Sequence, residues 1–218
     1  MAATRIASIL LSLAAATAPL GAAASAQVPG LPVLQNAFGN PGLSAALNFG
    51  SGGGASTYVG AASYGAGRLI LSGGVGAFVP DSGSTAASYG ARAALPLRSF
   101  MGGSLGVAAF AGVGGATLHD ISTTQVPLGV AVGWRHRLGD TRGVSVYAAP
   151  IAGYHRASGD GESESEWRFQ YAVGADLALT RRLGLTIGVG QASLPGHFQL
   201  GDTDTIFGVG VAWAFGAR

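Results

Sequence analysis

Large apolar residues alternate with small or polar residues along most of the chain after residue 42. The final stretch shows this best, because Phe207, Val209 and Trp213 share one face and glycine or alanine fills the positions between them. A period of two is typical of β-strands, and helical spacing is rare in this sequence. The pattern predicts strands at about 43–50, 56–65, 67–79, 86–98, 104–116, 126–138, 143–156, 166–180, 182–192 and 203–216.

The connections between these strands are alternately short and long after the first one. The long ones are expected at 80–86, 117–125, 156–164 and 192–202. Outer-membrane barrels have long extracellular loops and short periplasmic turns, and an even number of strands. The pattern therefore predicts an all-β, closed antiparallel transmembrane barrel of ten strands. An eight-stranded barrel, which would leave out residues 43–65, is the alternative.

The composition supports a membrane environment. Only 10% of the 218 residues are charged and 48% are hydrophobic, whereas soluble domains are about 25% charged. The chain has 38 glycines, no cysteine and no lysine, which excludes disulfide scaffolds, thiolate zinc sites and P-loop lysines. A net charge of +2 makes a nucleic-acid partner unexpected. No stretch after the first segment reaches the roughly 18 apolar residues of a transmembrane helix.

Residues 1–26 have the features of a cleaved secretory signal. Arg5 supplies a positive charge, residues 6–16 are apolar, and Ala24-Ser25-Ala26 is a small-x-small cleavage site. Residues 27–42 are expected to form a periplasmic lead-in, and residues 43–218 the barrel. Export without a helical anchor predicts the outer membrane of a Gram-negative cell envelope.

The sign of the charges follows the two predicted ends. Acidic residues lie in or beside the expected outer loops, and arginines lie at the expected inner turns. The acidic set is Asp81, Asp120, Asp160, Glu162, Glu164, Glu166, Asp202 and Asp204, and the basic set is Arg68, Arg98, Arg142, Arg181 and Arg182.

The apolar face of the strands is expected to contact lipid, because the other face is mostly glycine, alanine and serine. Aromatic residues fall near both ends of the apolar band, as in the girdles of membrane barrels. The expected girdle is Phe49, Tyr89, Trp134, Tyr154, Trp167, Phe169, Phe207, Trp213 and Phe215.

The small face then lines the lumen and carries a few polar residues. These are Asn48, Arg92, Arg135, Arg137, Arg168, Gln170 and Asp176. Arg135, Arg137 and Asp176 are expected together near the periplasmic end, where a structural ion pair would satisfy buried charge. The functional alternative is a constriction whose excess of arginine would favour anions.

The mature chain resembles the small outer-membrane β-barrels, the broad OmpA-like and opacity-protein-like group. The resemblance is carried by the Ala24–Ala26 cleavage site, the alternating strands and the closing strand Thr205–Phe215. It implies recognition of the last strand by the barrel-assembly machinery. The chain departs from that group by continuing with Gly216, Ala217 and Arg218, where a terminal aromatic residue is usual.

These features predict a structural, adhesive or narrow-pore role without catalysis, cofactor or metal, with outer-membrane lipid as the surrounding partner. The alternative is an outer-membrane hydrolase with a site at the extracellular rim. His119-Asp120 resembles half of the omptin-like constellation, but no Asp-Asp pair occurs. His155 with Ser158, Ser163 or Ser165 could form a lipid-deacylase-like site. The four histidines, His119, His136, His155 and His197, have no metal-binding spacing.

Overall fold

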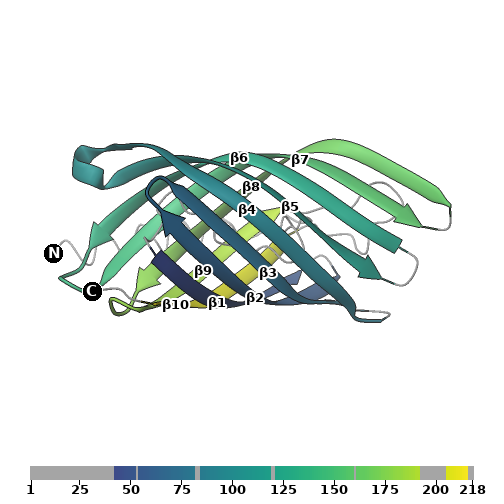
Figure 1. Cartoon of the computed structure of the whole chain (residues 1–218), viewed down its shortest axis with the longest axis horizontal. Helices are drawn as coiled ribbons and strands as arrows, with labels where there is room; N and C mark the ends of the chain where they lie inside the picture. The colour runs from purple at the N-terminus through teal and green to yellow at the C-terminus, as the bar shows by residue number, and fades with distance from the viewer. Residues whose placement is uncertain are drawn as a thin grey trace.

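Ten antiparallel strands form a closed barrel (Figure 1). We describe it from a computed structural model over residues 42–52, 54–81, 84–118, 121–159, 161–191 and 205–215. The strands are β1 (Gly42–Gly52), β2 (Ala55–Ala66), β3 (Leu69–Pro80), β4 (Ala86–Phe100), β5 (Leu105–Leu118), β6 (Ile121–Arg137), β7 (Gly143–Gly159), β8 (Glu162–Ala178), β9 (Leu183–Gln191) and β10 (Thr205–Ala214), with a short 3₁₀ turn η1 (Met101–Gly103). Within these residues, no helix is long and apolar enough to span a membrane.

Each strand pairs with its sequence neighbours, and β1 pairs with β10 to close the barrel. The closing ladder runs from Ser44 opposite Ala214 to Ser51 opposite Phe207. The prediction of a closed, ten-stranded, transmembrane barrel is confirmed. The eight-stranded alternative is wrong, because β1 and β2 are full members of the ladder.

The stagger of the ladder sets the width of the barrel. A row of directly paired residues that starts at Glu164 on β8 returns to β8 at Asp176, a shift of 12 residues. The row passes through Ala157, Thr123, Ala116, Ser88, Gly76, Val59, Asn48, Gly210 and Thr186. With ordinary strand spacings this stagger gives a strand tilt of about 40° and a backbone radius of about 10 Å. The interior is therefore wide enough to hold side chains.

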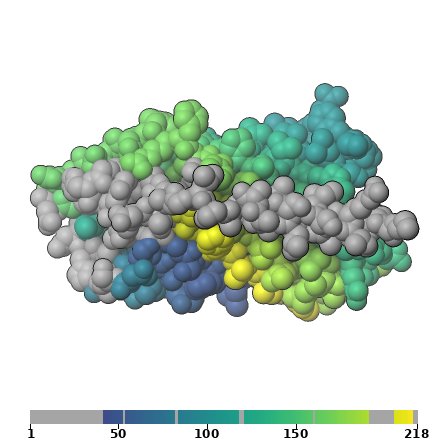
Figure 2. Space-filling model, turned by 180° about the vertical axis from the view of Figure 1, so that it is seen from behind, coloured from purple at the N-terminus to yellow at the C-terminus, as the bar shows by residue number. Residues whose placement is uncertain are grey.

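The two ends of the barrel differ. We call the end with the β2–β3, β4–β5, β6–β7 and β8–β9 connections the turn end, and the opposite end the loop end. Seen from behind, the green surface of the β7–β8 hairpin and the teal surface of the β4–β5 turn lie at opposite ends of the molecule (Figure 2). The expected signal 1–26, residues 27–41 of the expected lead-in 27–42, the expected loop 192–202 and Gly216–Arg218 lie outside the described residues. Gly42, the last residue of the expected lead-in, begins β1.

The strands fall into two halves of different length. Strands β4 to β8, the long half, have 14 to 17 residues each. Strands β9, β10, β1, β2 and β3 form the short half and have 9 to 12 described residues each. A tilted strand needs about 9–11 residues to cross a bilayer. The short half is thus matched to the membrane, and the long half extends beyond it.

Two expected loops are in fact strand. β6 begins at Ile121 rather than near residue 126, and β8 begins at Glu162 rather than near residue 166. The expected loops 117–125 and 156–164 therefore shrink to two-residue connections at 119–120 and 160–161. The prediction failed because both strand faces are polar there, so that the apolar alternation stops although the ladder continues.

The outer wall is apolar between two borders. Phe169 is 91% exposed and Leu47 is 73% exposed, values that only a lipid environment suits for such large apolar side chains. At the loop end, the row of Val126, Tyr154 and Trp167 marks a border, with polar Thr124, Arg156 and Ser165 in the next outward-facing row. The rings of Tyr154 and Trp167 lie 5.5 Å apart.

Every expected girdle residue lies in a described strand or directly after β10, and every one is exposed or partly exposed. Phe49 and Tyr58 mark the loop-end border on the short half, with ring centroids 5.2 Å apart. Trp134 and Trp213 lie near the turn end, on β6 and β10.

Candidate functional site

Charged side chains on the inward face belong to the long half throughout the described strands. The inward face of β8 alone presents a continuous series, since its burial alternates along the strand. The series runs from the loop end to the turn end as Glu162, Glu164, Glu166, Arg168 and Gln170, and Asp176 follows three inward positions further along the strand. The segment expected as a solvated acidic loop is therefore part of the lumen wall.

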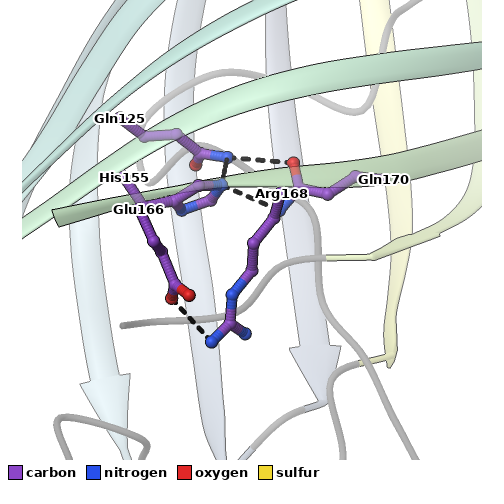
Figure 3. Close-up of polar contacts among 5 residues, drawn as sticks. All are labelled: Gln125, His155, Glu166, Arg168 and Gln170. Carbon is purple, nitrogen blue, oxygen red and sulfur yellow. Dashed lines mark hydrogen bonds and ion pairs between the residues drawn. The ribbon is translucent and has the colours of Figure 1, made fainter. Parts of the chain in front are cut away.

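A buried triangle of hydrogen-bonding groups lies on this wall, with one side chain each from β6, β7 and β8 (Figure 3). His155 is 2% exposed, and both amide nitrogens, of Gln125 and Gln170, lie within 3.1 Å of its Nε2 atom. Gln125 Nε2 also donates to Gln170 Oε1 at 3.1 Å. Because amide nitrogens are donors, this arrangement requires an imidazole Nε2 that accepts.

Gly153 makes room for this triangle. A Cβ atom on Gly153 would lie 2.6 Å from His155 Nε2 and 3.1 Å from Gln170 Oε1. Any larger residue there would push the imidazole and the amide apart. The glycine on β7 is thus a requirement of the polar network rather than of a turn.

Glu166 and Arg168 form an ion pair beside the triangle (Figure 3). Arg168 Nη2 lies 2.6 Å from Glu166 Oε1, and the two side chains are 26% and 32% exposed. Such a partly solvated pair contributes at most about 1 kcal/mol to stability. Its main consequence is electrostatic, because the charge of Arg168 is largely compensated.

An apolar layer follows toward the turn end. Phe110 and Ile151 are 6% and 2% exposed and pack among small residues of the long half. Arg92 lies over the ring of Phe110, with 5.6 Å between its guanidinium carbon and the ring centroid. The other members of this layer are Ala94, Ala108, Ala131, Ala149 and Ala172, with Ile70 packed against them.

The expected cluster of Arg135, Arg137 and Asp176 takes a different form. Asp176 accepts hydrogen bonds from Ser145 Oγ at 3.1 Å and from Thr186 Oγ1 at 2.6 Å. Arg135 is exposed and donates from Nε to the carbonyl of Gly103 at 2.8 Å. Arg135 therefore braces the β4–β5 turn, and Arg137 lies exposed at the same rim.

The remaining expected lumen residues lie on inward-facing positions. Gln170 is 6% exposed and belongs to the triangle, and Arg168 belongs to the ion pair. Asn48 is 8% exposed and lies on β1, in the short half.

The residues that sequence reasoning missed are Gln125 and the lumenal role of His155. Both were expected in or beside loops. The signal that could have found them is parity: Gln125 continues the odd-numbered inward positions of β6, and His155 those of β7. Extending the alternation through the polar stretches would have placed both in the lumen.

The hydrolase residues are not brought together as proposed from the sequence. His155 faces inward, whereas Ser158, Ser163 and Ser165 have the opposite parity on β7 and β8. Ser158 Oγ donates instead to the carbonyl of Ser122 at 3.5 Å. His119, Asp120 and His197 lie outside the described residues. In the part of the chain that the structure covers, no group of three or more His, Asp or Glu residues is arranged to hold a metal ion.

No protein-family model and no curated protein matches the chain. Among solved structures, it is similar to the KdgM porin at 12% identity and a TM-score of 0.41, covering 79% of this chain and 99% of that one. The KdgM porin in complex with disordered oligogalacturonate gives 13% identity, a TM-score of 0.42 and the same coverage. Ail, the attachment invasion locus protein of Yersinia pestis, gives 13% identity and a TM-score of 0.31, covering 81% of this chain and 100% of that one.

The strand order and register given above carry the assignment of the fold. The closed antiparallel β-barrel that the expected resemblance implies is confirmed by this strand order.

Proposed function

We propose that the protein is an outer-membrane barrel that forms a narrow polar passage for small solutes. The turn end faces the periplasm and the loop end faces the outside. The observation that carries this proposal is the unbroken polar series on the inward face of β8, from Glu162 to Gln170, inside a barrel of about 10 Å backbone radius. A wall of this kind offers hydrogen bonds to a passing solute in place of water.

The charge of the lumen wall favours cations. The hypothesis of an anion preference counted Arg135 and Arg137 as lumenal and Glu162–Glu166 as loop residues. The proposal is supported by the exposed position of Arg135, which donates to the Gly103 carbonyl, and by the three glutamates that share the inward face with Arg168. Glu162 at the loop-end rim and Arg135 and Arg137 at the turn-end rim are all exposed, so none of them is counted in the lumen. Because Glu166 compensates Arg168, the remaining charges are Glu164 and Asp176 against Arg92, and the lumen has an acidic balance.

Swelling of liposomes that contain the refolded barrel tests the passage. We expect faster swelling with small uncharged solutes such as glycerol or a pentose than with a trisaccharide, because the lumen is narrow. Liposomes with the same amount of heat-denatured protein are the control. Swelling no faster than in that control, for every solute, would refute the passage.

A surface-contact role is the second candidate, and the length of the long half favours it. β6, β7 and β8 have 17 residues each, so their loop-end portions stand beyond the apolar belt. The outer face there carries hydroxyl groups and one charge: Ser122, Thr124, Arg156, Ser158, Ser163 and Ser165.

We infer no catalytic role, since the imidazole of His155 is engaged by two amides and the nearby serines face the other way.

A further inference from the structure

A β-bulge near the turn end of β4 moves Arg98 from the lumen to the outer wall. Pro96 pairs with Ala108, but Arg98 pairs with Val107, so Leu97 and Arg98 together oppose one residue of β5. In a regular ladder Leu97 would face Val107, and Arg98 would fall on the inward face. Bulges commonly redirect a side chain to the other face of the sheet. Proline, which has no N–H to donate, is tolerated at a bulge because the hydrogen-bond ladder is interrupted there.

Three rings accompany Arg98 on this wall. Its guanidinium carbon lies 5.0 Å from the centroid of the Phe100 ring. Phe100 pairs with Leu105, which pairs with Trp134 on β6. The rings of Trp134 and His136 are stacked, 5.7 Å apart and 4° from parallel. Arg98, Phe100, Trp134 and His136, the border cluster, thus share the outward face at the turn-end edge of the apolar belt.

The electrostatic surroundings favour an anion. Seven of the ten described arginines lie at the turn end, and all seven are exposed: Arg68, Arg98, Arg135, Arg137, Arg142, Arg181 and Arg182. The four described connections at the turn end contain one acidic residue, Asp140. An Arg guanidinium can bind two oxygens of one phosphate, and aromatic side chains prefer the headgroup level of a bilayer.

We propose that the border cluster binds the headgroup of an anionic phospholipid in the leaflet at the turn end. Arg98 contacts the phosphate, Trp134 and His136 lie against the headgroup, and the acyl chains lie along the apolar outer wall. The site depends on the placement of the barrel in a membrane, and it is independent of whether solutes pass through the lumen.

Quenching of a single tryptophan by brominated lipids tests the site. The chain has three tryptophans, and Trp167→Phe with Trp213→Phe leaves Trp134 as a reporter inside the border cluster. We expect brominated phosphatidylglycerol to displace phosphatidylcholine at Trp134 with about fivefold preference, since one arginine near an anionic surface contributes about 1 kcal/mol. With Trp167 as the single reporter, at the loop-end border, the two lipids should quench equally.

Two arginine variants separate a site from general attraction. Arg98→Gln should reduce the preference at Trp134 to near one. Arg181→Gln removes the same charge from the β8–β9 connection at the same end, between two strands that carry none of the border cluster, and should leave most of the preference. Equal quenching by both lipids at Trp134 in the parent protein, or an equal loss with both variants, would overturn the proposal. Heat-modifiable gel migration shows that each variant forms the barrel.

Discussion

The two halves of the barrel divide its tasks. The short half spans the membrane with 9 to 12 residues per strand, and its described inward-facing side chains are uncharged. The long half has up to 17 residues per strand and carries the inward-facing charges and the buried triangle. Length and lumen chemistry therefore go together, because polar residues can line a strand on both faces only beyond the lipid. The short half closes the barrel within the membrane, and the long half supplies the charged and polar groups of the lumen.

Two glycines on opposite halves of the barrel are required for different reasons. A Cβ atom on Gly76 of β3 would collide with the backbone carbonyl of Tyr58, which cannot move without disturbing the ladder. On Gly153 of β7, a Cβ atom would meet the side chains of His155 and Gln170. Gly76 therefore allows the backbones of β2 and β3 to approach each other, and Gly153 leaves room for the hydrogen-bonded side chains of the triangle.

The largest expected effect comes from Gly76→Ala in the short half. We expect the free energy of unfolding in lipid vesicles, measured by urea titration, to fall by about 2–3 kcal/mol, because the added methyl group overpacks against backbone. Gly73→Ala on the same strand is the matched control, since its Cβ would lie 3.5 Å from the nearest atom, an ordinary contact. If both variants unfold at the same urea concentration, closure does not depend on the close approach at Gly76.

A smaller effect is expected from Gln170→Leu in the long half. This change removes one amide from the triangle and leaves buried groups of Gln125 with fewer partners, so the free energy of unfolding should fall by about 1–2 kcal/mol. Ser72→Ala is the control in the short half, because its hydroxyl makes only a long 3.5 Å contact with the Arg92 carbonyl. A double-mutant cycle of Gln125→Leu with Gln170→Leu measures the coupling. A coupling of zero would mean that the two amides are independent.

The sequence predicted the strands wherever one face is apolar, because lipid contact imposes alternation. It missed the starts of β6 and β8, where Ser-Thr and Glu-Ser stretches keep the ladder without an apolar face. It placed Arg98 at a turn, since a bulge changes parity and leaves no trace in an alternation pattern. The contact of Gln125 with Gln170 could not be predicted either, because it joins strands that are not neighbours in the ladder and depends on their tilt.

The reversal potential of the refolded barrel in a planar bilayer, under a potassium chloride gradient, tests most directly whether the long half sets the chemistry of a passage. We predict a cation preference in the parent protein and a shift toward anions in the double variant Glu164→Gln with Glu166→Gln, which also leaves Arg168 without its carboxylate. The control is Asp81→Asn, which removes one exposed negative charge from the β3–β4 connection. This variant should leave the reversal potential unchanged. An absence of conductance, an anion preference in the parent protein, or no shift in the glutamate variant would contradict the account.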